Sequence, residues 1–204
     1  DHIGAIPYLL RTVNVPIYAT RLAAGLIRGK LAEHGLLEKA ELHDLEAGDT
    51  FKAGCFKVEF IHTNHSISDS VALAIKTPVG MVIHTGDFKI DPTPVTGEMI
   101  DLARFGELGK KGVLALLSDS TNVETPGHCP SERQVGKRFD ELFNGCTQRI
   151  IITTFASNVD RIKQVIDCAA KYGRKVAVTG RSMENTLKVA LELGYIDPPK
   201  GVLM

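Results

Sequence analysis

The 204-residue sequence predicts an α/β protein built from two parts. Short strands separated by turns dominate the first part, where apolar and polar residues alternate. Strands and helices alternate with short links in the second part, which is typical of a parallel α/β unit. The pattern changes inside "NVETPGHCP", near residue 126. We therefore expect one domain at residues 1–125 and a second at residues 126–204.

The first part reads as a β-rich layer with few helices. Residues 15–20, "VPIYAT", predict a short strand, and residues 21–37 follow with leucines at roughly helical spacing. Residues 51–65 contain a strand in which every second residue is apolar. Residues 70–87, "SVALAIKTPVGMVIHTGD", predict two strands joined by a turn at the Pro-Val-Gly triplet.

The second part follows a strand that we expect to be buried, residues 112–121, "GVLALLSDST". Ser131 and Gln134 have the spacing of a capping box and open a helix. Two further strand–helix pairs then follow, and each helix ends at a glycine. This order predicts right-handed parallel connections. The pairs are a strand at 148–155 with a helix at 157–173, and a strand at 175–180 with a helix at 181–194.

Composition and charge limit the classes of partner. Lys plus Arg and Asp plus Glu both number 24, so bulk charge gives no sign of a nucleic-acid partner and any such site must be local. No apolar run approaches the length of a membrane span, and no secretory signal opens the chain. The four cysteines form no CxxC pair, so we expect free thiols in a reducing cytoplasm rather than disulfides.

Metal-ligand residue types gather where strands give way to loops. Asp1 and His2 precede a Gly-containing segment, and His65 follows the strand "VEFIHT". Asp87 ends the strand "MVIHTG", where Gly86 allows a tight turn. Two imidazoles and two carboxylates suit a hydrolytic site for zinc or manganese. Asp87 has two oxygens and could bridge two metal ions.

Several of these motifs resemble a known family. "DHIGAIPYLL" resembles the end of the His-x-His-x-Asp-His signature of the metallo-β-lactamase fold. "TNHSI" and "HTGDFKID" resemble that fold's next histidine motif and its bridging-aspartate motif. "LLSDSTN", "PSER", "TTFASN" and "GRSMEN" resemble ribonuclease J, of the β-CASP nuclease branch. The resemblance implies a partial metallo-β-lactamase αββα sandwich followed by part of a β-CASP parallel α/β domain.

The resemblance also implies roles for individual residues. Asp1 and His2 would ligate the second metal, His65 would ligate the first, and Asp87 would bridge both. Asp119 matches the acidic residue that opens the β-CASP motif series, where it helps to orient a ligand or proton carrier. Asp1 and Asp119 are accordingly the catalytic candidates. Two Zn²⁺ ions per site are implied, with Mn²⁺ or Mg²⁺ as alternatives.

The chain departs from the family pattern at both ends. The His-x-His half of the signature would lie before Asp1, and the later β-CASP histidine motifs would lie beyond Met204. We therefore expect a fragment of a longer protein that is inactive alone, whatever the intact protein does. By resemblance, the intact protein would be a cytoplasmic homo-oligomer.

Two loops and five histidines complete the candidates. "TTFASN" and "VTGRSMEN" each end a strand and open a helix, where main-chain N–H groups can hold phosphate. Ser157, Asn158, Arg181 and Ser182 are the candidate substrate contacts, although both serines could simply cap helices. His62 and His84 fit hydrogen bonding behind a metal ligand, or packing, better than direct ligation. We expect His34, in a helical stretch, and His43, in a loop, to be solvated, and His128 to lie in the inter-domain loop.

The leading hypothesis is a metal-dependent ribonuclease that acts on RNA as a 5′-to-3′ exonuclease, an endonuclease or both. One alternative is another hydrolase of this fold acting on a thioester or lactam, but small-substrate members lack the β-CASP part. A second alternative is an RNA-binding protein without catalysis. A nucleotide-binding Rossmann site is disfavoured because the sequence contains no GxGxxG.

Overall fold

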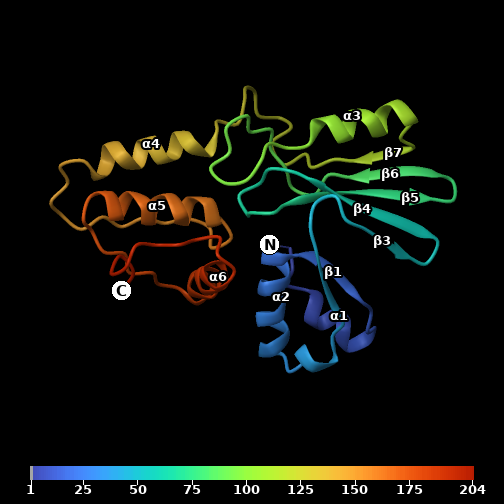
Figure 1. Ribbon diagram of the computed structural model, residues 1–204, viewed down its shortest axis with the longest axis horizontal. Coiled ribbons are helices and arrows are strands. Elements are labelled where there is room, and N and C mark those ends of the chain that lie inside the picture. The colour runs from blue at the N-terminus through green and yellow to red at the C-terminus, as the bar shows by residue number, and fades with distance from the viewer. Residues whose placement is uncertain (1) are drawn as a thin grey trace.

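The computed structural model describes residues 2–204 and has a mixed α/β architecture with parallel and antiparallel strands. Figure 1 shows a mostly antiparallel sheet, a small unit beneath it that carries the N-terminus, and a block of helices beside them that ends at the C-terminus. The predicted fold class is confirmed.

The small unit is made from residues 6–45. Helix α1 (Ile6–Thr12) leads to β1 (Ile17–Thr20), α2 (Arg21–Glu33) and, after a short 3-10 turn, β2 (Leu42–Leu45). The strands β1 and β2 run parallel. One face of α2 is buried, which explains the apolar spacing in the sequence. Its buried residues are Leu22, Ala24, Ile27 and Leu31.

The expectation for one histidine in this unit is wrong. His43 lies within β2 rather than in a loop, and its ring stacks on that of Tyr18 with 4.7 Å between the ring centroids. Strand β2 has only four residues. Its parallel pairing with β1 fixes it, and that pairing depends on contacts far along the chain rather than on a local pattern.

The larger sheet has the strand order β3-β4-β5-β6-β7 within residues 2–204. Neighbouring strands are antiparallel from β3 to β6, whereas β6 and β7 are parallel. Helix α3 (Leu102–Lys111) packs on one face, where Leu108 joins a buried cluster with Ile61 and Ile83. The strands are β3 (Thr50–Ala53), β4 (Phe56–His62), β5 (Val71–Thr77), β6 (Gly80–His84) and β7 (Ala115–Leu117).

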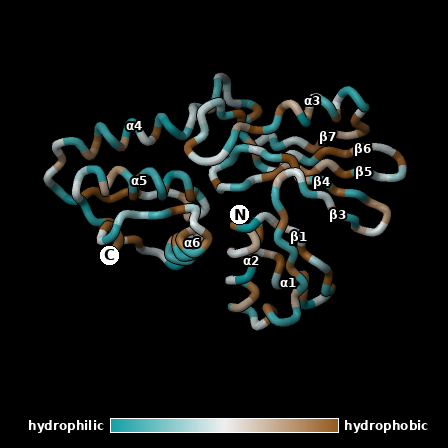
Figure 2. Tube along the Cα trace, in the orientation of Figure 1, coloured by the Kyte–Doolittle hydropathy of each residue, from teal (hydrophilic) through white to brown (hydrophobic). Residues whose placement is uncertain are grey.

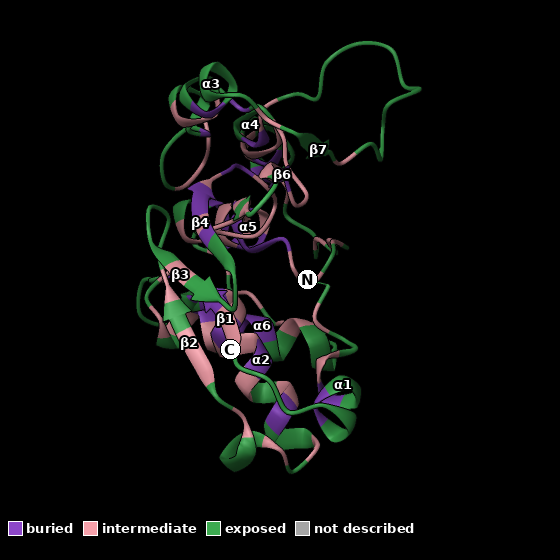
Figure 3. Cartoon of the chain, turned by 90° about the vertical axis from the view of Figure 1, so that its right-hand side faces the viewer, coloured by how far each residue is buried: buried purple, intermediate pink, exposed green. Residues whose placement is uncertain are grey.

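Strand β7 differs from the expectation of a buried strand. All three of its residues are exposed, and Leu116 and Leu117 keep 60% and 52% of their surface accessible. Figure 3 shows β7 in the exposed colour, whereas β4 carries buried residues. The reason is position: among residues 2–204, β7 is the last strand of the sheet and pairs with β6 alone. Apolar composition alone did not reveal this edge position.

The C-terminal block contains three helices at the predicted places: α4 (Glu132–Phe143), α5 (Val159–Lys171) and α6 (Arg181–Glu192). The Ser131 hydroxyl accepts from the N–H of Arg133 at the start of α4. Figure 2 shows α4 as mainly hydrophilic. Its apolar residues Phe139 and Phe143 are buried in one cluster with Ile162 and Ile166 of α5.

The prediction of regular strands at residues 148–155 and 175–180 is wrong. Within residues 2–204, no main-chain hydrogen bonds join residues 148–155 to residues 175–180. The one bridge in this region pairs Val176 with Leu203 in parallel. Both segments have strand-like composition, but a strand is defined by its partner's hydrogen bonds, which composition cannot supply.

The described residues also contain no helix that is long and apolar enough to cross a membrane.

Candidate functional site

The topology brings three strand ends to one edge of the larger sheet. Strands β4 and β6 both run antiparallel to β5, and β7 runs parallel to β6. The carboxyl ends of β4, β6 and β7 therefore share an edge. The segments that follow these strands carry His65, Asp87 and Asp119.

Gly86 makes the turn that presents Asp87. Its φ is +60°, and an added Cβ would lie 3.1 Å from the Val71 carbonyl oxygen. Glycine is thus required both by conformation and by space. The strand can end abruptly, and the next side chain leaves the sheet at its edge.

Asp87 is the centre of the candidate metal site. Its Oδ2 lies 3.0 Å from His2 Nε2 and 3.8 Å from His65 Nε2. Burial lowers the pKa of His65, and the opposing charge of Asp87 offsets part of that effect. A neutral imidazole is the form that binds metal ions. The structure brings three of the four predicted ligands together: His2, His65 and Asp87. The fourth, Asp1, lies outside the described residues.

Asp119 approaches the same edge from β7. Its Oδ1 accepts hydrogen bonds from the Thr121 hydroxyl at 2.6 Å and the Thr121 N–H at 2.9 Å. The bond from the Thr121 hydroxyl is the main reason that the pKa of Asp119 is lowered. Asp119 is therefore held as an anion, which suits a residue that orients a ligand.

Thr85 connects the two acidic loops, and sequence reasoning missed it. Its buried hydroxyl accepts from the Asp119 N–H at 2.9 Å and donates to the Gly86 carbonyl at 2.8 Å. A single side chain thus fixes the backbone beside both Asp87 and Asp119. Its place in the "HTGD" motif was the available signal.

The described side chains suit a metal ion chemically but do not complete a site. Imidazole and carboxylate donors are those that zinc and manganese accept. Nevertheless, residues 2–204 contain no group of three or more His, Cys, Asp or Glu side chains arranged to hold a metal ion. His2, His65 and Asp87 therefore fit as part of a ligand set.

The other described histidines do not contact Asp87 through their side chains among the described interactions. His62 Nε2 lies 3.0 Å from the Glu98 carbonyl oxygen, and His84 Nδ1 accepts from the Gly86 N–H at 3.0 Å. His34 is half-buried and lies 3.2 Å from Arg11 Nη2, so it is only partly solvated. His128 is exposed in the loop between the two halves.

Three of the four candidate substrate contacts line one groove. Ser157, Arg181 and Ser182 border a groove of about 870 Å³ between α2 and α6. Arg181 Nη2 lies 3.2 Å from Glu33 Oε1, and its side chain is 81% exposed. Asn158 does not line this groove. It is buried and caps α5, because its Oδ1 accepts from the Arg161 N–H at 3.0 Å.

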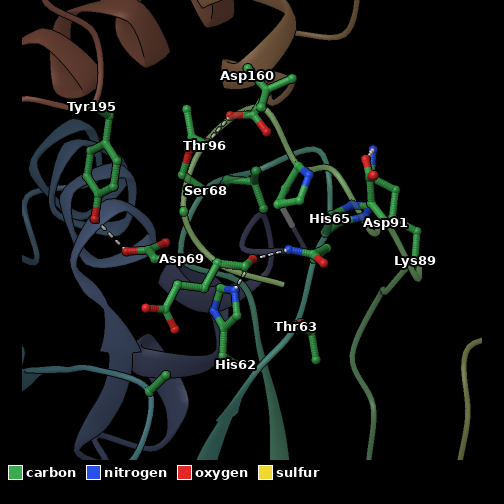
Figure 4. A pocket seen from close by; sticks show the side chains of 17 residues that line it. His62, Thr63, His65, Ser68, Asp69, Lys89, Asp91, Thr96, Asp160 and Tyr195 are labelled. Atoms are coloured by element: carbon green, nitrogen blue, oxygen red, sulfur yellow. Dashed lines mark hydrogen bonds and ion pairs between the residues drawn. The ribbon is translucent and has the colours of Figure 1, made fainter. Parts of the chain in front are cut away.

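A cavity of about 360 Å³ lies between the two halves of the chain, beside His65. Figure 4 shows Asp69 bonded to Tyr195 and Asp160 to Thr96 across this seam. Burial raises the pKa of both carboxyl groups. The sequence did not indicate these pairs, because Asp69 and Tyr195 are 126 positions apart.

Comparisons with known proteins identify relatives along the whole chain. Residues 147–204 match the family described as "Ribonuclease J, beta-CASP domain". The protein named ribonuclease J from Synechocystis is 49% identical over 206 aligned positions, which cover 100% of this chain and 32% of that protein. Ribonuclease J from Helicobacter pylori strain J99 is 50% identical, covering 98% of this chain and 29% of the relative. The chain thus spans about a third of the length of these relatives.

A solved structure supports the fold alone. The crystal structure of a protein of unknown function from Enterococcus faecalis V583 superposes with a TM-score of 0.65 at 18% identity. The superposition covers 93% of this chain and 49% of the other. The family resemblance rests on the curated relatives and the matched β-CASP segment, and they lead to one conclusion: the resemblance to the ribonuclease J family is confirmed over the whole length of this chain.

Proposed function

We propose that this chain forms part of a metal-dependent ribonuclease that hydrolyses phosphodiester bonds in RNA. The observation that carries the proposal is the meeting of His2 and His65 on one oxygen of Asp87, at the edge where Asp119 also lies. The names of the relatives give the substrate class. The proposal concerns the protein at its full natural length, since the chain covers about a third of those relatives.

The chain's residues divide the work between ligation and orientation. His2, His65 and Asp87, together with Asp1, would hold Zn²⁺, with Mn²⁺ or Mg²⁺ as alternatives. A divalent ion supplies such a site with activation of water and neutralisation of charge on the phosphoryl oxygens. Asp119 is kept anionic by Thr121, so it can orient the attacking water.

The groove between α2 and α6 is the proposed path for the RNA backbone. Arg181 is exposed at its rim, and the guanidinium geometry suits a phosphate group. Ser157 and Ser182 lie on the same groove and can donate hydroxyl hydrogen bonds to phosphate oxygens. RNA would have to compete with Glu33 for Arg181. That exposed ion pair is weak, so the exchange costs little.

The finer features of this proposal rest on the resemblance. They are 5′-to-3′ exonuclease or endonuclease action, two metal ions per site, a cytoplasmic location and assembly into a homo-oligomer.

Contacts to phosphate position a nucleic acid without reading its sequence. Because Ser157, Arg181 and Ser182 are proposed to contact phosphate groups, we propose no RNA sequence preference for this groove.

A substrate panel tests the proposed function. The full-length protein would be stripped with a chelator and then assayed with labelled RNA, DNA and a thioester, with and without added Zn²⁺ or Mn²⁺. We expect RNA cleavage that disappears on stripping and returns with metal. Thioester turnover without RNA cleavage would favour the small-substrate alternative, and RNA binding without cleavage under any metal would favour the non-catalytic one.

A further inference from the structure

One long loop joins the candidate metal site to the second half of the chain. We call residues 89–100 the strap; it begins two residues after Asp87 and ends just before α3. Both of its ends are tied to Asn64, which precedes the ligand His65. The Lys89 N–H donates to the Asn64 carbonyl at 2.8 Å, in an isolated antiparallel bridge.

The side chain of Asn64 holds the far end of the strap. Its Nδ2 donates to the Glu98 carbonyl at 2.8 Å, and its Oδ1 accepts from the Ile100 N–H at 2.9 Å. Asn64 is 6% exposed, so both polar atoms of the amide are satisfied by the strap backbone in a buried setting.

The middle of the strap contacts the helices of the second half. Asp91 Oδ2 accepts from the Glu132 N–H at 3.1 Å, and the Thr96 hydroxyl donates to Asp160 at 2.5 Å. These contacts lie at the first turns of α4 and α5. The strap therefore has three supports: Asn64, the start of α4 and the start of α5.

We propose that Asn64 is a positioning residue that sets the separation of His65 and Asp87. The inference rests on the proposed metal site. The bridge between Asn64 and Lys89 is antiparallel. His65 and Asp87 therefore lie on the two facing segments, on the same side of this bridge. The side-chain amide closes the strap into a ring through Asn64, so Asp87 cannot shift along the strap direction without breaking a buried hydrogen bond.

The competing interpretation is that Asn64 only stabilises the fold. His62 provides a matched control, because it approaches the same Glu98 carbonyl, at 3.0 Å, from two residues earlier. His62 does not bond Ile100 or Lys89 among the described hydrogen bonds, so its loss leaves the ring closed. A purely structural role predicts similar behaviour for variants at the two positions.

The test compares Asn64→Ala and His62→Ala in the full-length protein. Zinc affinity is measured by competition with a coloured chelator, at a temperature where each variant is folded by circular dichroism. We expect Asn64→Ala to bind zinc at least about tenfold more weakly, the size of effect seen when a group that orients a ligand is removed. We expect His62→Ala to stay within about threefold of the parent, since it is not part of that orienting shell. The d–d absorption bands of bound Co²⁺ should change for Asn64→Ala alone.

Asn64→Asp is the second variant, for use if the alanine variant does not fold. It keeps the acceptor for Ile100 and loses the donor to Glu98, so an intermediate loss of zinc affinity is expected. If both folded Asn64 variants bind zinc like the parent, or if His62→Ala weakens binding equally, the positioning role is wrong. A parent protein that binds no zinc would instead overturn the proposed metal site, and this inference with it.

Discussion

The carboxylate of Asp91 caps helix α4 from 41 positions upstream, with its Oδ2 3.1 Å from the main-chain nitrogen of Glu132. Its Oδ1 accepts from the Thr93 N–H at 2.9 Å, and the side chain is 2% exposed. Burial alone would raise the pKa of Asp91, but these hydrogen bonds outweigh it and the pKa is lowered. A buried anion here adds to the local cap by Ser131 and joins the two halves of the chain.

Replacing Asp91 by asparagine should therefore destabilise the protein. One of its two acceptor oxygens becomes a donor facing an N–H group, and Lys89 loses a charge partner at 3.8 Å. We expect a loss of about 1.5–3 kcal/mol in the free energy of unfolding, the range for hydrogen bonds to charged groups. Urea denaturation measures it. Asp44→Asn removes an exposed ion pair with Arg28 and should cost less than about 1 kcal/mol.

The ion pair between Glu59 and Arg104 should make stability depend on acid pH. Arg104 donates to both oxygens of Glu59, at 2.6 and 2.8 Å. These hydrogen bonds are the main reason that the pKa of Glu59 is lowered. The folded state thus binds this proton more weakly than the unfolded state. The contribution is present above the unfolded pKa of about 4.3 and is lost as the pH falls through the folded pKa.

Glu59→Gln tests this pH dependence. The variant should be less stable than the parent at pH 7, and the gap in urea midpoint should narrow below about pH 4, as the parent's carboxylate takes up its proton. Glu107→Gln is the control, since Glu107 also bonds Arg104 but is 61% exposed. A gap that stays constant from pH 7 to pH 3 would show that the ion pair does not act through the charge of Glu59.

Gly86→Ala should damage both stability and the metal site. The residue must hold a φ of +60°, and its new Cβ would press on the Val71 carbonyl oxygen. The conformation alone costs about 1–2 kcal/mol, and any relief moves Asp87. Thermal unfolding and zinc affinity should both fall. Gly29→Ala is the contrast, because Gly29 lies in α2 with no atom near its Cβ position and should gain about 0.5–1 kcal/mol.

Asp87→Ala should lower RNA cleavage by the full-length protein by orders of magnitude. It removes the oxygen that both His2 and His65 approach. Folding should suffer less, since the site lies on loops at a sheet edge. His84→Ala should be milder, on the order of 10–100-fold, because His84 acts only through the Gly86 N–H. Single-turnover cleavage measures both, and near-normal cleavage with full metal content in Asp87→Ala would refute its role as a bridge.

The 204-residue chain alone should bind zinc weakly and cleave no RNA above background. Residues 2–204 contain no ligand group complete enough for a metal ion. The unpaired sides of β3 and β7 should also promote association, especially beside the exposed Leu116 and Leu117. Equilibrium dialysis, an RNA cleavage assay and light scattering test the three statements. Metal-dependent cleavage by this chain would show that the ligand assignment is wrong.

Local patterns predicted the elements whose signals are local. The helix starting after Ser131 and those ending before Gly173 and Gly194 were found because caps and glycine stops lie within a few residues of each other. The turn at Gly86 was predicted for the same reason. Helix α1 was missed because it has only seven residues, and strand β2 because its partner is distant.

The sequence indicated the histidine and acidic side chains of the candidate site, but not the residues that hold them in place. His65, Asp87 and Asp119 follow strand ends, and a strand end is visible in the sequence. Their supports are not visible there, because Thr85 bonds a loop 34 residues away and Asn64 bonds residues 34 and 36 positions away. Which polar residues are buried together depends on the packing of the two halves, and no periodicity encodes that.

The capping of helices by remote acids has a consequence for how the protein unfolds. Asp69 accepts from the Leu22 N–H at the start of α2 and from the Tyr195 hydroxyl, as Asp91 does from α4. These helix starts are thus complete only after distant segments have come together. The described chain should therefore unfold in one cooperative transition rather than domain by domain. The main-chain amides of α2 and α4 should be protected from hydrogen exchange to a similar degree.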